Sequence, residues 1–316
     1  MHKRSISFAA LAAATALTLA ACGTADEGGE TTGTATGDGG GGGASIGLAL
    51  STLNNPFFVS LRDGAQAAAD EGGADLTVTD ARDDATQQAD QIQNFQTQQL
   101  DAVIINPVDS DAAGPMLAPL VTAEVPVVAV DRAVNGAEVD AFVASDNVEG
   151  GRLAAEALAE AIGETGQIIV LQGVAGTSAS RERGQGFTEG IAAFPNIEVV
   201  ATQPADFDRA QGLDVATNLL QAHADVVGIF AENDEMALGA IQALGDRAGQ
   251  DVFVVGFDGT EDAVAAIEAG TMYASIAQQP EELGRAAVES ALALVAGEEV
   301  EATVAVPVVV LTQDSL

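Results

Sequence analysis

The amino-acid sequence predicts an α/β protein with two doubly wound parallel sheets. From residue 45 onward, short apolar runs alternate with turns and Ala-rich amphipathic stretches, the pattern of a parallel sheet with helices on both faces. The expected strands are residues 46–50, 76–79, 103–105, 127–130, 142–144, 168–171, 198–201, 226–230, 253–257, 273–277 and 304–311. The expected helices include residues 56–71, 84–99, 147–162, 181–193, 209–222, 234–245 and 280–296. Roughly ten strands are many for one doubly wound sheet, so we expect two sheets and therefore two lobes.

Polar residues follow almost every expected strand, and ligands of such folds bind beyond the carboxyl ends of the strands. Among them are Ser51, Asn54, Asn55, Asn106, Asp131, Arg132, Ser145, Asp146, Asn147, Gln172, Glu232, Asn233, Asp234, Asp258 and Gln278. Turns favour Asn, Asp and Gly, which accounts for part of this set without any ligand. Turn preference does not account for Arg132, Gln278 or the adjacent Phe57 and Phe58. These positions are therefore candidates for a binding site.

The first 44 residues predict export followed by a tether. A basic start at His2, Lys3 and Arg4 precedes a mildly apolar run, residues 6–21, which is too short for a membrane span. The run ends in the sequence LAAC at residues 19–22, the lipobox pattern in which the Cys22 thiol accepts a lipid. The alternative is an ordinary signal peptide with an accidental cysteine. We expect residues 1–21 to be a lipoprotein signal peptide and residues 22–44 a disordered Gly-rich tether.

Composition excludes several classes of site. The chain has 47 acidic and 11 basic residues and a net charge of −36, so its surface repels nucleic acid. The only lysine is Lys3, within the predicted leader, which excludes sites built on a P-loop lysine or a Schiff-base lysine. One cysteine and two histidines cannot assemble a zinc cluster. We therefore expect no cofactor, no metal site and no nucleic-acid partner.

Five long segments make the chain resemble the bacterial ribose-binding proteins, of the periplasmic sugar-binding family related to lactose-repressor-type regulators. They are residues 51–61 (STLNNPFFVSL), 175–184 (AGTSASRERG), 203–209 (QPADFDR), 233–240 (NDEMALGA) and 255–260 (VGFDGT). The resemblance implies the type I periplasmic binding protein fold, with three crossovers near residues 145–146, 278–279 and 309–310. It divides the chain into an N-terminal lobe, residues 45–145 plus 279–309, and a C-terminal lobe, residues 146–278 plus 310–316.

The same resemblance implies a set of ligand-binding residues. They are Asn55, Phe57, Phe58, Asp131, Arg132, Arg181, Phe207, Asn233, Phe257, Asp258 and Gln278, with Ser51 close by. The chemistry of these residue types agrees, because aromatic faces pack on the C–H surfaces of a sugar. Arginine donates, aspartate accepts, and the amides do both, which suits hydroxyl groups.

The resemblance further implies a solute-binding protein of an ABC sugar importer, monomeric, that closes over D-ribose and presents the closed form to the permease. Export and the lipid anchor would place it on the outer face of the cell membrane, or in the periplasm. Allose, a polyol or a furanose-like signal are alternative ligands, and a sensory role is an alternative use of the same fold. No enzyme is expected: His223 lies at a helix end, and the glycines at 184, 186 and 190 do not have dinucleotide-loop spacing.

Overall fold

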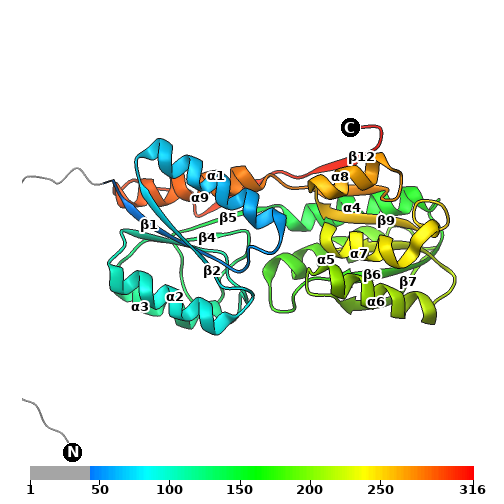
Figure 1. Ribbon diagram of the computed structural model, residues 1–316, viewed down its shortest axis with the longest axis horizontal. Coiled ribbons are helices and arrows are strands. Elements are labelled where there is room, and N and C mark those ends of the chain that lie inside the picture. The colour runs from blue at the N-terminus through cyan, green and yellow to red at the C-terminus, as the bar shows by residue number, and fades with distance from the viewer. Residues whose placement is uncertain (1–42) are drawn as a thin grey trace, which may run out of the picture. The chain divides into compact units, whose positions relative to one another are not determined.

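A computed structural model describes residues 43–316 and contains two six-stranded sheets, each covered by helices on both faces (Figure 1). The predicted signal peptide, Cys22 and nearly all of the predicted tether lie outside the described residues. Within residues 43–316, no helix combines the length and the apolar character that a bilayer crossing requires. The predicted fold class, two doubly wound α/β lobes, is confirmed.

The first sheet is entirely parallel and has the strand order β11-β5-β4-β3-β1-β2. Its strands are β1 (Ser45–Leu50), β2 (Asp75–Asp80), β3 (Ala102–Ile105), β4 (Val127–Val130), β5 (Ala141–Ser145) and β11 (Thr303–Val306). Helices α1 (Pro56–Gly72) and α9 (Pro280–Val295) pack on one face, while α2 (Ala85–Gln98) and α3 (Ala113–Thr122) pack on the other. Burial on both faces explains why the central strands β1, β3, β4 and β5 read as nearly continuous apolar runs. We call this sheet with its helices the first lobe.

The second sheet has the order β12-β10-β9-β8-β6-β7, and only β12 runs antiparallel to its neighbour. Its strands are β6 (Gly166–Gln172), β7 (Ile197–Pro204), β8 (Val226–Ala231), β9 (Phe253–Asp258), β10 (Ala274–Ala277) and β12 (Val309–Thr312). Helices α4 (Asn147–Ala161) and α5 (Ser178–Ile191) cover one face. Helices α6 (Arg209–Ala222), α7 (Asp234–Leu244) and α8 (Glu261–Glu268) cover the other, and the short η1 (Gly245–Arg247) follows α7. We call this sheet with its helices the second lobe.

The chain passes between the two sheets three times: between β5 and α4, between β10 and α9, and between β11 and β12 (Figure 1). The third passage corrects a prediction. Residues 304–311 were expected to form one strand with a lobe boundary after Val309, but Val309 pairs with Ala277 in the second sheet. Pro307 has no backbone N–H to donate to a sheet, so the apolar run splits there into β11 and β12.

Two helices were absent from the expected set. Helix α3 contains Gly114, Pro115 and Pro119, residues that disfavour a helix interior, so its sequence carries little helical signal. Its buried Leu117 and Leu120 pack against the first sheet. Helix α8 is only eight residues long. In both cases burial against a sheet stabilises a helix that local preference does not predict.

Candidate functional site

A cavity lies between the two lobes, and its walls come from both of them. Its lining residues are Asn55, Phe57, Phe58, Asp131 and Arg132 from the first lobe, and Ala179, Arg183, Phe207, Asn233, Asp258 and Gln278 from the second. Nine of the twelve residues predicted for a ligand site lie in this set. The structure therefore brings together residues that are more than 200 positions apart, such as Asn55 and Gln278.

Local structure explains how two asparagines are placed at the cavity. Asn55 caps α1, where its Oδ1 accepts a hydrogen bond from Phe57 N at 2.9 Å. Asn233 caps α7, where its Oδ1 accepts from Met236 N at 3.0 Å. The Asn233 Nδ2 also donates to Phe207 O at 3.2 Å, which ties together two lining residues. Each asparagine thus lies in the cavity wall at the start of a helix.

Aromatic rings surround the two buried guanidinium groups. The Arg132 guanidinium lies 5.3 Å from the Phe58 ring centre and 5.6 Å from the Phe207 ring centre. These two rings belong to different lobes, so Arg132 sits between aromatic faces of both. The Arg183 guanidinium lies 3.8 Å from the Phe257 ring centre, within cation–π range. Stacking of this kind fixes the planes of the guanidinium groups and leaves their N–H edges free to donate.

The cavity holds two carboxylates, each beside an arginine. Asp131 Oδ2 lies 3.7 Å from Arg132 Nε, and Asp258 Oδ1 lies 3.6 Å from Arg183 Nη1. All four side chains are at most 5% exposed. Burial raises the pKa of Asp131 and raises that of Asp258 well above its usual range, although the neighbouring arginines oppose both shifts. Burial likewise lowers the pKa of Arg132.

Two polar atoms of the cavity lack a hydrogen-bond partner among the described residues. Arg132 Nε has no acceptor within range, and Gln278 Oε1 has no donor, although Gln278 Nε2 donates to Asp258 Oδ1 at 2.7 Å. Buried polar atoms without partners cost roughly 1–3 kcal/mol each. A ligand that both donates and accepts hydrogen bonds would satisfy both atoms.

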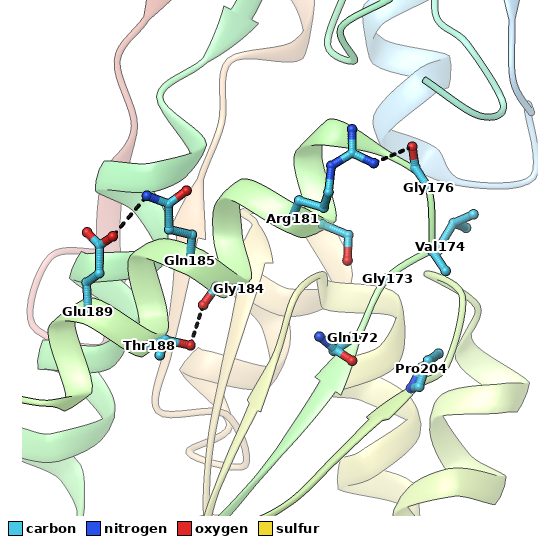
Figure 2. Close-up of a pocket in the computed structure, with 12 residues that line it drawn as sticks. Gln172, Gly173, Val174, Gly176, Arg181, Gly184, Gln185, Thr188, Glu189 and Pro204 are labelled. Atoms are coloured by element: carbon cyan, nitrogen blue, oxygen red, sulfur yellow. Dashed lines mark hydrogen bonds between the residues drawn. The ribbon is translucent and has the colours of Figure 1, made fainter. Parts of the chain in front are cut away.

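Arg183 is a lining residue that the sequence analysis missed, and Arg181 was predicted in its place. Arg183 is 3% exposed, and it donates from Nη1 to Glu232 O at 2.7 Å and from Nε to Asn147 Oδ1 at 2.9 Å. Arg181 lies on the outer side of α5 and donates to Gly176 O at 2.9 Å (Figure 2). Two positions along a helix differ by about 200° in direction, so the two arginines face opposite sides. Arg181 was predicted as a ligand residue, and the structure places it outside this cavity for this reason.

Two more predicted residues lie behind the cavity and do not line it. Ser51 is fully buried, and its Oγ donates to Asn106 Oδ1 at 2.6 Å. Phe257 is fully buried beneath the Arg183 guanidinium. Ala179, the other missed residue, offers only a methyl group, which carries no signal in a sequence read for polar chemistry.

A separate pocket of about 520 Å³ lies on the second lobe alone (Figure 2). It is lined by residues at the ends of β6 and β7 and along the outer side of α5, including Gln172, Pro204, Arg181 and Gln185. None of its lining residues belongs to the cavity between the lobes. Beneath its floor, the buried Glu232 accepts hydrogen bonds from Gly173 N and Ser180 Oγ, and burial raises the pKa of Glu232 to about 7.

Comparison with known proteins shows the family to which the chain belongs. Residues 46–299 match the family described as periplasmic binding protein domain. The chain belongs to this family. It is 48% identical to the ribose import binding protein of Escherichia coli over 258 residues, which is 82% of this chain and 87% of the relative. It is 44% identical to the ribose import binding protein of Bacillus subtilis, over 85% of this chain and 87% of the relative.

A solved structure extends the comparison. The periplasmic solute-binding protein of an Actinobacillus succinogenes ABC transporter, with bound D-allose, aligns with a TM-score of 0.81 and 33% identity. The alignment covers 86% of this chain and 98% of that one. The relatives are binding proteins, which confirms the prediction that this periplasmic binding protein is not an enzyme. Within residues 43–316, no three His, Cys, Asp or Glu side chains are grouped so that they could hold a metal ion.

The lobes of this binding protein also touch outside the cavity, through a cluster that we call the serine contact. Ser178 N of the second lobe donates to Ser110 Oγ of the first at 3.0 Å, and Ala133 N donates to Ser178 Oγ at 2.8 Å. Ser110 N donates to Gly176 O at 3.2 Å. Both serines are buried. The serine contact therefore joins the lobes through residues that do not themselves line the cavity.

Replacing either serine of this contact with alanine is expected to weaken ligand binding about three- to tenfold. The physical reason is that one buried hydrogen bond between the lobes, worth about 0.5–1.5 kcal/mol, is lost from the joined state. Titration calorimetry of Ser110→Ala and Ser178→Ala checks this. Ser290→Ala, on α9 and outside the contact, is the matched control. The loss should be the same factor for every sugar, and a change in sugar preference would contradict this assignment.

Proposed function

We propose that this protein binds D-ribose in the cavity between its lobes and delivers it to the permease of an ABC importer. The observation that carries the proposal is the lining of that cavity, where aromatic rings, two arginine–carboxylate pairs and unpartnered amide and guanidinium atoms converge from both lobes. The identity of 44–48% to ribose import binding proteins supports ribose as the sugar. The chain is a solute-binding protein for sugar import, and the choice of sugar is the proposed step.

The lining suits a pentose. A pentose presents C–H surfaces to Phe57, Phe58 and Phe207, and hydroxyl groups around its edge. Each hydroxyl donates one hydrogen bond and accepts others, so the carboxylates can accept from it while the arginines donate to it. Hydrogen bonds to charged partners are the stronger kind, worth about 1.5–3 kcal/mol.

Binding also requires the lobes to move. In the arrangement described, the cavity measures about 20 Å³, close to the volume that admits one water molecule and far below that of a pentose. The lobes are joined by only three short connections, so a hinge there opens the cavity without disturbing either sheet. Sugar that contacts both walls would favour the closed form, and the permease would recognise that form. Residues of a single chain, all within 43–316, supply both walls of the cavity, and we infer that the protein acts as a monomer.

Thermal shift measurements with ribose, arabinose and xylose test the choice of sugar. These pentoses have equal size, and only the orientation of single hydroxyls differs. An inverted hydroxyl leaves a buried partner unpaired, so we expect ribose to bind at least about tenfold more tightly per inverted centre. At a ribose concentration about a hundred times Kd, the folded state gains about 2.7 kcal/mol, or a few degrees. The chain has no Trp, so intrinsic fluorescence is a poor probe.

Allose belongs in the same experiment, because a relative of 33% identity and TM-score 0.81 is described with bound D-allose. A shift with millimolar allose or a polyol, and none with millimolar ribose, would overturn ribose and retain the sugar-binding role. The absence of any shift across these sugars would count against the cavity as a sugar site.

We also propose that the protein is anchored to the outer face of the cell membrane by lipid on Cys22. The lipobox at residues 19–22 supports this anchor. The variant Cys22→Ser has no thiol to accept lipid and is expected to move from the membrane fraction to the soluble fraction when the cells are fractionated. Sugar binding by the released protein should equal that of the parent, since the cavity lies within residues 43–316. Equal membrane retention of the two forms would contradict the anchor.

A further inference from the structure

A buried amide lies directly behind one carboxylate of the cavity. Asp131 follows β4, and its Oδ2 accepts a hydrogen bond from Asn106 Nδ2 at 3.0 Å. Asn106 follows β3, the strand beside β4, and is fully buried. It does not line the cavity. Within residues 43–316, only Oδ2 of the Asp131 carboxylate is engaged in a hydrogen bond, so the other oxygen stays available to a ligand.

The surroundings of Asn106 fix which way its amide points. Ser51 donates to Asn106 Oδ1 twice, from Oγ at 2.6 Å and from N at 3.3 Å. The amide oxygen must therefore face Ser51, and the Nδ2 group must face Asp131. The second N–H of Nδ2 donates to Val130 O at 3.2 Å. All hydrogen-bonding capacity on the nitrogen is used, and a flipped amide would set donors against the Ser51 donors.

A second amide holds the backbone of Asn106. Gln88 of α2 is fully buried, its Nε2 donates to Asn106 O at 2.9 Å, and its Oε1 accepts from Val108 N at 2.9 Å. The strand end that carries Asn106 is thus held from both sides, by Ser51 and by Gln88. Such an arrangement resists rotation of the Asn106 side chain when a ligand pulls on Asp131.

We propose that Asn106 is a positioning residue of the sugar site: it holds one oxygen of Asp131 and so aims the other at a ligand hydroxyl, and Ser51 sets the orientation of Asn106. This inference rests on the proposed function and adds two residues that do not line the cavity. In this proposal Ser51 supports the site by holding Asn106 and does not contact the ligand. That role explains why Ser51, which was predicted as a ligand residue, is fully buried and does not line the cavity.

Charge strengthens the case for the amide. Burial raises the pKa of Asp131, and the Asn106 N–H opposes that shift, as do Arg132 and Arg183. The Asp131 charge in turn helps to raise the pKa of two nearby acids, Asp258 and Glu182. A carboxylate at position 106 would replace a donor with an acceptor beside Asp131. The aspartic acid at position 106 could donate a hydrogen bond to Asp131, as the amide does, only when one proton is bound between these two acids.

The variant Asn106→Asp tests this role through the pH dependence of sugar affinity. We expect ribose affinity to fall at least about tenfold at pH 8 and to recover as pH falls towards 5, because protonation restores a donor to Asp131. The parent protein in the same buffers should change much less, since its amide donates at every pH. Asn94→Asp adds the same charge on the exposed side of α2 and is the matched control. Calorimetry measures affinity, and circular dichroism checks folding.

A second variant tests the same role in case Asn106→Asp does not fold. Ser51→Ala frees the amide to turn, and we expect a smaller loss of affinity, about three- to tenfold, without recovery at low pH. Parent-like affinity of Asn106→Asp from pH 5 to 8, or of Ser51→Ala if the former does not fold, would overturn the positioning role. A loss for folded Asn106→Asp that is the same at every pH would also overturn it. A parent protein that binds none of the sugars would overturn the proposed function as well, so the two failures are distinguishable.

Discussion

Replacing Arg183 with methionine is expected to weaken ribose binding by about 3–5 kcal/mol, roughly a hundredfold to several thousandfold. The methionine keeps most of the apolar stem over Phe257 but removes every donor. Asp258, which lies 3.6 Å from Arg183 Nη1, then loses its neighbouring charge in a buried site. A ligand hydroxyl loses the charged donor on the second-lobe side of the cavity. Titration calorimetry with ribose measures the loss.

Arg181→Met is the matched control for this experiment. Arg181 lies on the same helix and has the same charge, but its contact with Asp111 at 3.4 Å is solvent-exposed, with side chains 45% and 63% exposed. Exposed ion pairs contribute about 0–1 kcal/mol, so the expected change in affinity is less than about fivefold. The reverse pattern, with Arg181→Met abolishing binding and Arg183→Met harmless, would show that the cavity is not the sugar site.

Replacing Asp258 with asparagine is expected to weaken ribose binding by about 2–4 kcal/mol while leaving the ligand-free protein as stable as before or more so. The Asp258 side chain is buried, and the backbone of this residue has φ 125°. Few residues other than glycine adopt a positive φ, and asparagine tolerates it better than alanine, so asparagine is the replacement chosen. Sugar hydroxyls lose a charged acceptor. The amide oxygen of the variant can still accept from Gln278 Nε2, which bonds Asp258 Oδ1 at 2.7 Å, so this buried hydrogen bond is kept.

The stability of the ligand-free variant follows from the pKa of Asp258. Burial raises the pKa of this carboxyl well above its usual range in the folded state. The folded state therefore binds the proton more tightly than the unfolded state, and stability is lost as pH rises from the ordinary Asp value through the folded value. At pH 8 the charged form costs stability, and the neutral amide removes that cost. Thermal unfolding without sugar, at pH 8, checks the sign.

Opposite effects on binding and on stability separate a binding residue from a packing residue. A site that holds charges for a ligand is destabilising when the ligand is absent. If Asp258→Asn lowers the melting temperature of the ligand-free protein and leaves ribose affinity unchanged, then Asp258 acts in packing and not in binding. Phe230→Leu, deep in the second lobe, should show that packing pattern.

Local sequence determined most of the architecture of this protein. Continuous apolar runs predict parallel strands, because helices cover both faces of such a sheet and the side chains on both faces are buried. Asn55 and Asn233, which follow expected strands, do line the cavity, since ligands of these folds bind beyond the carboxyl ends of the strands. The three passages between the lobes were implied by the family resemblance and not by local sequence, and two of them lie at the expected residues.

Only the tertiary structure decided which side chains reach the cavity. Arg181 and Arg183 lie in the same short segment, and the rotation of α5 against the sheet buries one and exposes the other. Ser51 stands at a strand end like Asp131 but is covered by Asn106. The tertiary structure also decided which sheet each half of the apolar run 304–311 joins. On either side of Pro307, β11 pairs with β5 in the first sheet and β12 pairs with β10 in the second. Composition and periodicity fix an element and its buried face, whereas the direction of one side chain depends on how that element is rotated and packed against its neighbours.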